Sequence, residues 1–260
     1  MSILLLIGHL LLITDEPQRL TLDIDGVKRE ALVYSPSQKP TEAGAPLVLA
    51  YHGHGGTARY AANRFGFHKQ WPEAVVVYPQ GLTGVAGITD PEGKKSGWQK
   101  NPGEQGDRDV KFFDALLTEI VKHYKIDANR IYVMGHSNGS RFACVLWNMR
   151  GDKLASLCMA CGQGGRLLDK APQRSVIMIA GEKDPLVPYD GQMLSINAVR
   201  KAYACDAATA KKDGYWQVQR GKDGLEVATY LHPGGHEFPT ELVPKIVDFW
   251  KRQVRPAAAH

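Results

Sequence analysis

Short apolar runs alternate with helical segments along most of this chain, and this alternation restricts the fold more than any other feature. The apolar runs have the length of β-strands and lie at residues 18–24, 28–34, 46–52, 74–79, 130–134, 155–161, 174–180 and 226–232. Helical patterns lie between or after them, at residues 57–66, 110–124, 138–149, 192–204 and 240–253. Strands that alternate with helices are typical of a largely parallel sheet with crossover helices. We therefore expect an α/β fold with a mostly parallel, eight-stranded sheet and helices on both faces.

Three segments allow more detailed predictions. Asp25-Gly26 separates the first two runs and predicts a β-hairpin. Residues 110–124 carry an apolar stripe, and Asp109 precedes them as a candidate helix N-cap. The stripe comprises Phe113, Leu116, Leu117, Ile120, Val121 and Tyr124. Residues 81–108 are rich in Gly, Lys and Asp and have no sustained periodicity, which indicates a loop that is functional or mobile.

The domain organisation follows from what separates the segments. No repeat and no Pro/Ser-rich linker divides residues 18–254, so we expect a single domain there. Residues 1–17 form an N-terminal apolar extension, whose core at 3–13 is about half the ~20 residues that a membrane-spanning helix needs. No Lys or Arg precedes this core and no cleavage site follows it, so we favour a packed or added segment over a signal-peptide remnant. Residues 255–260 are interpreted as a tail or tag scar.

Composition and charge exclude several classes of protein. Hydrophobic residues make up 43% and charged residues 23% of the chain, the balance of an ordinary globular protein. The net charge of +5 is spread thinly, in pairs such as Lys94-Lys95, so no nucleic-acid partner is expected. We expect a secreted or periplasmic protein, with a cytoplasmic location as the alternative.

The four cysteines, at positions 144, 158, 161 and 205, are too few for a disulfide scaffold. Cys158 and Cys161 have the spacing of a metal or redox motif, but no second such pair accompanies them. They fall in a predicted buried strand, in which residues three apart point to opposite faces. We interpret them as small core thiols, and we expect no metal.

The strongest chemical signal is the sequence Gly135-His136-Ser137-Asn138-Gly139, which stands between an apolar strand and a helix. A strand that turns at once into a helix places the serine at a strained, exposed corner. Glycines two residues to either side are needed because a Cβ there would collide with neighbouring strands. Ser137 is therefore the candidate nucleophile, with a tight structural turn as the alternative.

A serine needs a base to remove its proton and a carboxylate to orient that base. This fold supplies them later in the chain, on loops that follow strands. Asp184 follows the strand at 174–180 and is the candidate acid, with Glu182 and Asp190 as competitors. His236 follows the last strand and two glycines, and we favour it over His232, which is expected to end the strand and pack there.

The reaction also needs backbone N–H groups to stabilise an oxyanion. Asn138, at the start of the helix, should provide one. The glycine-rich loop His52-Gly53-His54-Gly55-Gly56 should provide the other from the amide of His54. This loop lacks the Lys-Ser/Thr ending of a phosphate-binding loop and does not match GxGxxG.

These motifs together resemble the feruloyl esterase and poly(3-hydroxybutyrate) depolymerase branch of the α/β-hydrolases, similar to carbohydrate esterase family 1. The matching stretches are Pro46–Gly56, Gly97-Trp98, Arg108-Asp109-Val110, Arg130–Gly139, Asp184–Tyr189 and Gly234-Gly235-His236. Two departures exist: relatives often carry Cys at the positions of His54 and Gly97, so that cross-link is missing, and Ser140 replaces a usual Gly. The resemblance implies an α/β-hydrolase fold.

The expected activity is hydrolysis of carboxylic esters through an acyl-enzyme, without a cofactor. The resemblance implies feruloyl or short-chain acyl esters, either small or linked to polysaccharide, with poly(3-hydroxybutyrate) and acetylxylan as alternative substrates. It also places a Trp near the active site, so Trp98 is the candidate substrate-binding residue; the alternative is that Trp98 only anchors its loop. A non-catalytic binding module on a hydrolase fold is the rival from another class.

Overall fold

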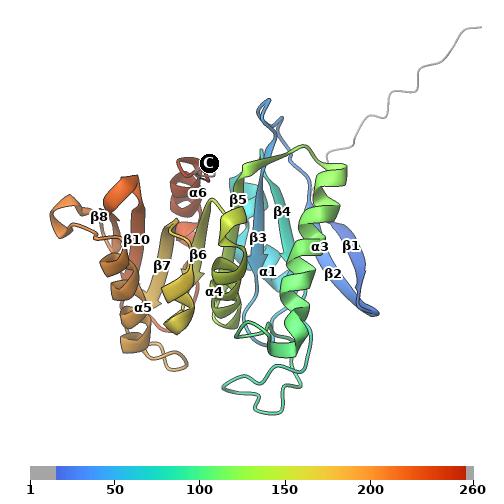
Figure 1. Ribbon diagram of the computed structural model, residues 1–260, viewed down its shortest axis with the longest axis horizontal. Coiled ribbons are helices and arrows are strands. Elements are labelled where there is room, and N and C mark those ends of the chain that lie inside the picture. Colours follow the sequence, from blue (N-terminus) through green and yellow to red (C-terminus); the bar gives the residue numbers. More distant parts are fainter. Residues whose placement is uncertain (1–15, 256–260) are drawn as a thin grey trace, which may run out of the picture.

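The computed structural model describes residues 16–255, and these residues form a ten-stranded mixed sheet flanked by helices (Figure 1). The order across the sheet is β1-β2-β4-β3-β5-β6-β7-β10-β9-β8. In chain order the strands are β1 (Gln18–Ile24), β2 (Val27–Tyr34), β3 (Ala45–Tyr51), β4 (Val75–Pro79), β5 (Ile126–His136), β6 (Ser156–Ala160), β7 (Ser175–Gly181), β8 (Lys211–Asp213), β9 (Trp216–Arg220) and β10 (Glu226–His232). The six central strands are parallel; in order across the sheet they are β4, β3, β5, β6, β7 and β10. The strands at both edges of the sheet are antiparallel to their neighbours.

Helices cover both faces of the sheet, as the sequence predicts. They are α1 (Ala58–Phe65), α2 (Phe67–Gln70), α3 (Arg108–His123), α4 (Asn138–Arg150), α5 (Tyr189–Ala202) and α6 (Val243–Lys251). Short 3-10 turns lie at Glu104–Asp107, Gly151–Lys153, Gly165–Lys170, Ala207–Thr209, Lys222–Gly224 and Thr240–Leu242. One apolar core joins the sheet to α3, α4 and α5, and a second joins it to α1, α2 and α6. The two cores follow from strands that are apolar on both faces, which is the pattern of a parallel sheet covered on both sides.

The expectation of eight strands is wrong, because the sheet has ten. The two additional strands, β8 and β9, form an antiparallel hairpin that extends the sheet beyond β10. All three residues of β8 are exposed and none is apolar, so they have no hydrophobic pattern. Gly214, which has a positive φ in the two-residue loop Gly214-Tyr215, was a local signal for this hairpin. The hairpin predicted at Asp25-Gly26 is present, with positive φ at both residues.

The start of α3 corrects a second expectation. Asp109 is not an N-cap: it lies inside the first turn, is buried, and forms an ion pair of 2.8 Å with Arg29. The side chain of Gln99 accepts hydrogen bonds from the N–H groups of Asp109 and Val110 instead. A residue ten positions away thus caps the helix. The apolar stripe packs as expected except at Val121, which is 57% exposed.

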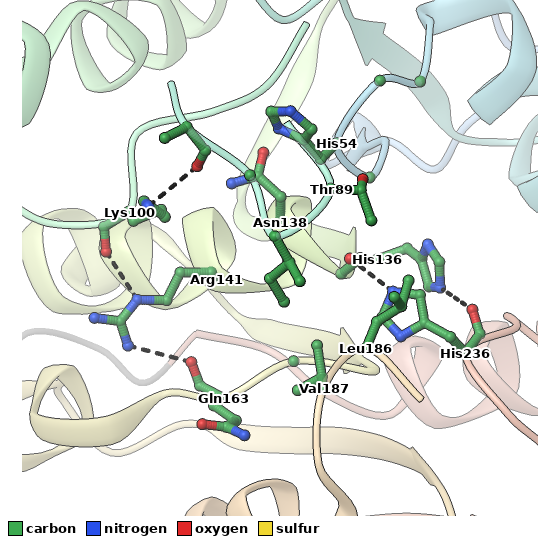
Figure 2. Close-up of a pocket in the computed structure, with 18 of the residues that line it drawn as sticks. His54, Thr89, Lys100, His136, Asn138, Arg141, Gln163, Leu186, Val187 and His236 are labelled. Atoms are coloured by element: carbon green, nitrogen blue, oxygen red, sulfur yellow. Dashed lines mark hydrogen bonds between the residues drawn. The ribbon is translucent and has the colours of Figure 1, made fainter. Parts of the chain in front are cut away.

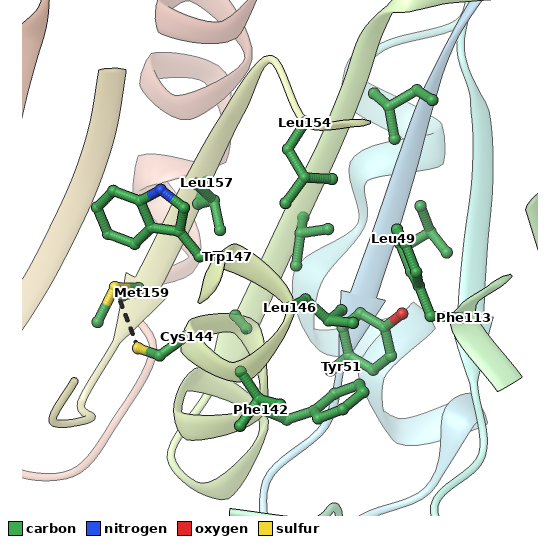
Figure 3. Packing of buried hydrophobic residues seen from close by; sticks show 14 of the residues in the cluster. Leu49, Tyr51, Phe113, Phe142, Cys144, Leu146, Trp147, Leu154, Leu157 and Met159 are labelled. Carbon is green, nitrogen blue, oxygen red and sulfur yellow. Dashed lines mark hydrogen bonds between the residues drawn. The ribbon is translucent and has the colours of Figure 1, made fainter. Parts of the chain in front are cut away.

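The core beneath the strand-to-helix turn is dense (Figure 3). Phe142 on α4 stacks on Trp98, with ring centroids 5.5 Å apart, and Tyr51 meets both rings edge-on. Cys144 and Cys158 are buried free thiols in the two cores, and Cys161 is also buried and free. This agrees with their interpretation as core residues. The packing gives the start of α4 a rigid base.

No helix within residues 16–255 is both long and apolar enough to cross a membrane. The predictions for residues 1–15 and 256–260 lie outside the described residues.

Candidate active site

Ser137 occupies the sharp turn between β5 and α4. Its backbone has φ 56° and ψ −119°, a conformation that non-glycine residues rarely adopt. A Cβ at Gly135 would lie 2.1 Å from the carbonyl oxygen of Gly139, and one at Gly139 would lie 2.4 Å from that of Tyr51. Only glycine fits at either position. The two glycines therefore let the turn be tight enough to project the serine from the end of the sheet.

Three side chains from the ends of three strands form a continuous hydrogen-bonded chain. Ser137 Oγ lies 2.7 Å from His236 Nε2, and His236 Nδ1 lies 2.7 Å from Asp184 Oδ2. With the proton on Nδ1, the imidazole donates to the carboxylate and accepts from the serine hydroxyl. Because β5, β7 and β10 are parallel and lie close together in the sheet, their carboxyl ends bring these residues to one edge.

The Asp184 carboxylate is held as an ionised acceptor. Its side chain is fully buried, which alone would raise its pKa. Hydrogen bonds from the N–H groups of Val187 and Leu186, together with His236, outweigh burial and lower the pKa of Asp184 below its usual value. Gln192 on α5 donates a further bond of 3.0 Å to Oδ2. The carboxylate is thus fixed toward the imidazole.

The competing residues named from the sequence lie elsewhere. Glu182 and Asp190 are exposed, whereas Asp184 is buried. His232 ends β10 and is buried, and its Nδ1 accepts a hydrogen bond from the N–H of Gly234. The structure therefore brings His236 to Ser137 and leaves His232 packed at the strand end.

A second histidine supports the loop that carries His236. His136 is largely buried, and its Nε2 donates a hydrogen bond of 3.1 Å to the carbonyl oxygen of His236. Burial lowers the pKa of His136 to about 4, so its imidazole is neutral near pH 7. It can therefore hold the loop without adding a positive charge beside His236.

One group of side chains has the spacing of metal ligands. Atoms of Cys161, Asp184 and His236 all lie within 4.8 Å of one another. Burial raises the pKa of the Cys161 thiol to about 12, so it stays protonated, and a thiol is a poor ligand without ionisation. Asp184 and His236 already bond to each other. This donor set does not suit a metal ion.

The hydrogen-bonded chain opens into a cavity of about 1110 Å³ (Figure 2). Its lining comes from residues 53–57, Tyr60, residues 86–89, Pro91, Lys100, residues 136–138, Arg141, residues 162–163, residues 186–188 and His236. The volume exceeds what an acetyl group needs and suits a ligand of drug size or a segment of a polymer.

Both predicted oxyanion donors, His54 and Asn138, line this cavity beside Ser137. Neither of their backbone N–H groups donates a hydrogen bond within residues 16–255. Asn138 is the first residue of α4, so its N–H also lies at the positive end of the helix dipole. The two residues thus lie at the cavity, and their backbone N–H groups are unpaired within the described residues.

The side chains of these two residues hold the long loop between β4 and α3. His54 Nε2 donates to Asp90 at 2.9 Å, and Asp90 also accepts from the backbone N–H groups of Lys94 and Lys95. These bonds lower the pKa of Asp90 to about 2. Asn138 exchanges two hydrogen bonds, of 2.7 and 2.9 Å, with the backbone of Trp98. The loop is therefore attached to both candidate oxyanion residues.

The cross-link of the relatives, which the sequence indicates is missing here, has an imidazole in its place. A Cβ at Gly97 would lie 2.8 Å from Nδ1 of His54, so residues 54 and 97 are in contact without cysteines. The polar pair of His54 and Asp90 holds this part of the loop instead.

The position of Trp98 does not suit a wall for substrate. Its side chain is fully buried, it is absent from the cavity lining, and its Nε1 donates a 2.9 Å hydrogen bond to the carbonyl oxygen of His52. It packs beneath the loop, against Tyr51 and Phe142. This placement favours the alternative role, in which Trp98 anchors the loop.

Sequence reasoning missed three supporting residues, Asp90, His136 and Gln192. Asp90 and Gln192 make their contacts with residues 36 and 8 positions away, and no local pattern marks them. His136 stood inside the pentapeptide, and its place beside the nucleophile was the one available signal.

The chain has relatives whose names describe esterases. One relative is the protein of Nocardia uniformis subsp. tsuyamanensis that is named as the esterase NocK. The two chains are 29% identical over 169 residues, a match that covers 60% of this chain and 45% of that one. This chain is 25% identical over 193 residues to the bifunctional acetylxylan esterase/xylanase XynS20E of Neocallimastix patriciarum, covering 73% of this chain and 26% of that protein. This chain thus spans less than half the length of either relative. No protein-family model matches it.

Among solved structures, the acetyl xylan esterase from Aspergillus awamori superposes with a TM-score of 0.71 at 12% identity, covering 90% of this chain and 98% of that one. At 12% identity, this structural similarity shows a shared fold alone. The chain has the α/β-hydrolase fold. The resemblance to the esterase branch that the motifs indicate is confirmed by the names of the two relatives.

Proposed function

We propose that this protein is a serine carboxylic-ester hydrolase that works through an acyl-enzyme. Ser137 attacks the ester carbonyl, and His236 takes the serine proton and then gives it to the leaving alcohol. Asp184 holds the imidazole in its working tautomer and stabilises the imidazolium that forms. A water activated by His236 then releases the acid product.

The observation that carries this proposal is the hydrogen-bonded chain from Asp184 through His236 to Ser137, with both bonds at 2.7 Å. Its position at the mouth of a large cavity gives a substrate access to the hydroxyl. A decayed enzyme that only binds ligands has no reason to keep all three residues in reacting geometry, which argues against the non-catalytic binding module.

The amides of His54 and Asn138 are proposed to stabilise the tetrahedral oxyanion. Both residues line the cavity with Ser137, and their N–H groups are unpaired within the described residues. A donor of this kind contributes on the order of 3 kcal/mol to the transition state. The loop contacts of both side chains would hold the two amides in place before substrate binds.

For the substrate we propose feruloyl or short-chain acyl esters, small or polysaccharide-linked. Acetylxylan is a second candidate, favoured by the name of one curated relative and of one structural neighbour. Esters on a plant polysaccharide would be met outside the cytoplasm, in keeping with a secreted or periplasmic location, which fractionation of producing cells would test.

A hydrolysis panel tests the proposal. It contains p-nitrophenyl acetate, butyrate and octanoate, methyl ferulate, acetylated xylan and poly(3-hydroxybutyrate), each assayed with the wild type and with Ser137→Ala. We expect hydrolysis of at least one acyl ester that Ser137→Ala abolishes. Absence of hydrolysis across the panel, or hydrolysis that survives Ser137→Ala, would refute the assignment.

A further inference from the structure

The cavity beside Ser137 has an unusual charge distribution. Lys100 and Arg141 line it, but none of the residues lining it is an Asp or a Glu. Neither cation forms an ion pair within residues 16–255. Two positive charges at a concave surface, without a neutralising carboxylate, produce a positive potential inside it.

Arg141 is held in place without being neutralised. It lies four residues after the nucleophile on α4, and its guanidinium donates to the carbonyl oxygens of Lys100, Gln163 and Gly164. A fourth bond goes to the side-chain oxygen of Asn101. All four acceptors are neutral. The guanidinium is therefore oriented in advance and retains its charge for a ligand.

Lys100 adds the second charge from the long loop. Among the residues that the structure describes, its Nζ donates only to the carbonyl oxygen of Ala86, at 3.1 Å. The nearby carboxylate of Glu104 accepts hydrogen bonds from the backbone N–H groups of Lys100 and Asn101 and does not line the cavity. Figure 2 shows Lys100 and Arg141 together at one end of the cavity, with Asn138 between them and the pair of His136 and His236.

Three exposed apolar side chains also line the cavity. Tyr60, Ile88 and Leu186 line the cavity with 57%, 74% and 38% of their surface exposed. Exposed apolar side chains at a cavity rim mark a surface that binds apolar groups. A ligand that satisfies both parts of the lining has an apolar body and a negatively charged group.

We infer that the preferred substrate is an ester that also carries a carboxylate, which Lys100 and Arg141 bind at the end of the cavity away from His236. This inference rests on the proposed function, since it names the substrate class of the same site. The carboxylate is a group separate from the ester that is cleaved, and it stays unchanged in the reaction.

Matched pairs of esters test this inference. 4-Acetoxybenzoate and 4-acetoxybenzamide differ in the charge of the leaving group, and monoethyl adipate and ethyl hexanoate differ in the charge of the acyl part. We expect kcat/KM for the anionic member of at least one pair to exceed that of its neutral partner about fivefold or more. The pair that responds identifies the part of the substrate that carries the carboxylate. Raising the salt concentration from 0.05 to 0.5 M should reduce this preference, because salt screens the attraction.

Three variants assign the preference to the site. Lys100→Met keeps the aliphatic stem and should lower the anionic-to-neutral ratio of kcat/KM about threefold to fivefold, and Lys100→Arg should restore it. The control is Lys94→Met: Lys94 lies on the same loop, is exposed, pairs with Glu92 and does not line the cavity. It should leave the ratio at the wild-type value.

The outcomes of these experiments distinguish the carboxylate site from the esterase assignment. Hydrolysis of both members of each pair with equal efficiency, or a ratio that Lys100→Met does not change, overturns the carboxylate site and leaves the esterase assignment standing. Failure to hydrolyse any of these esters or the acyl esters of the earlier panel overturns both. A fall in the ratio with Lys100→Met but not with Lys94→Met supports the site.

Discussion

The two sides of the cavity are constructed differently. On one side Ser137, Asp184 and His236 follow β5, β7 and β10, and the parallel sheet itself brings them together. On the other side lies the loop between β4 and α3, which contains isolated β-bridges and one 3-10 turn and is held by polar side chains. Its attachments are His54 to Asp90 and Asn138 to the backbone of Trp98.

This difference in construction indicates that the sheet side and the loop side have different roles. The sheet fixes the three candidate catalytic side chains by hydrophobic packing on both of its faces, and this arrangement tolerates changes in surrounding loops. The loop fixes the cavity wall and the candidate oxyanion residues through a few hydrogen bonds, each of which a single substitution can remove. We therefore expect changes on the sheet side to abolish the reaction and changes on the loop side to weaken or redirect it.

The largest effect is expected from Ser137→Ala, which should lower kcat by at least about 10³-fold, because only oxyanion stabilisation and binding remain. Circular dichroism and thermal melting should show an intact fold. A variant that retained a tenth of wild-type esterase activity would remove Ser137 from the nucleophile role.

Asp184→Asn and His236→Ala should each lower kcat by about 10³-fold or more. Neither should add much to Ser137→Ala, because the three residues act as a unit. The matched control is Asp190→Asn, an exposed carboxylate near the same loop, which should stay close to the wild-type rate. If His232→Ala lowered kcat more than His236→Ala did, His236 would be the wrong choice of catalytic base.

On the loop side, Asp90→Asn should lower kcat/KM about tenfold, because an amide cannot accept all of the N–H bonds that Asp90 now receives. Glu92→Gln, which changes an exposed carboxylate on the same loop, serves as the control and should have little effect. Equal activity of the two variants would mean that the bond between His54 and Asp90 does not influence the reaction.

The hydrogen bonds that Asp90 accepts from the Lys95 N–H and from His54 predict a pH dependence of stability. The pKa of Asp90 is lowered from 3.8, the ordinary value of an Asp side chain, to about 2 in the folded protein. The ionised carboxylate therefore contributes its full stabilisation above about pH 4, and this stabilisation is lost as the pH falls toward 2. The difference in melting temperature between wild type and Asp90→Asn should therefore shrink between pH 4 and pH 2. A difference that stays constant across this range contradicts the role of the ionised Asp90 carboxylate.

The smallest effect on selectivity is expected from Trp98. Trp98→Ala should destabilise the fold by about 3–5 kcal/mol, because it empties a fully buried site, and should reduce the rates on methyl ferulate and p-nitrophenyl acetate by similar factors. Ile88→Ala, at an exposed rim position of the same loop, should change the ratio of the two rates without lowering stability. A changed ratio with unchanged stability in Trp98→Ala would restore Trp98 as a substrate wall.

The sequence predicted the sheet side of the cavity well and the loop side poorly. The order of Ser137, Asp184 and His236 after successive strands could be read locally, because each lies where a strong hydrophobic pattern stops. The burial of Trp98 and the contact between Asp90 and His54 depend on partners dozens of residues away, and no periodic pattern in the sequence indicates them. The strands β8 and β9 were missed because an exposed edge hairpin needs few apolar residues. Asp109 was misassigned because Gln99 caps α3 instead.

The central claim, that Ser137 is the reacting nucleophile, is tested most directly by covalent trapping. Diethyl p-nitrophenyl phosphate phosphorylates activated serines, and intact-mass and peptide mass spectrometry locate the adduct. We predict one diethylphosphoryl group per chain on the peptide that contains Ser137, loss of esterase activity in proportion to labelling, and no labelling of Ser137→Ala or His236→Ala. A stoichiometric adduct on another residue, or full activity after complete labelling of Ser137, would contradict the account.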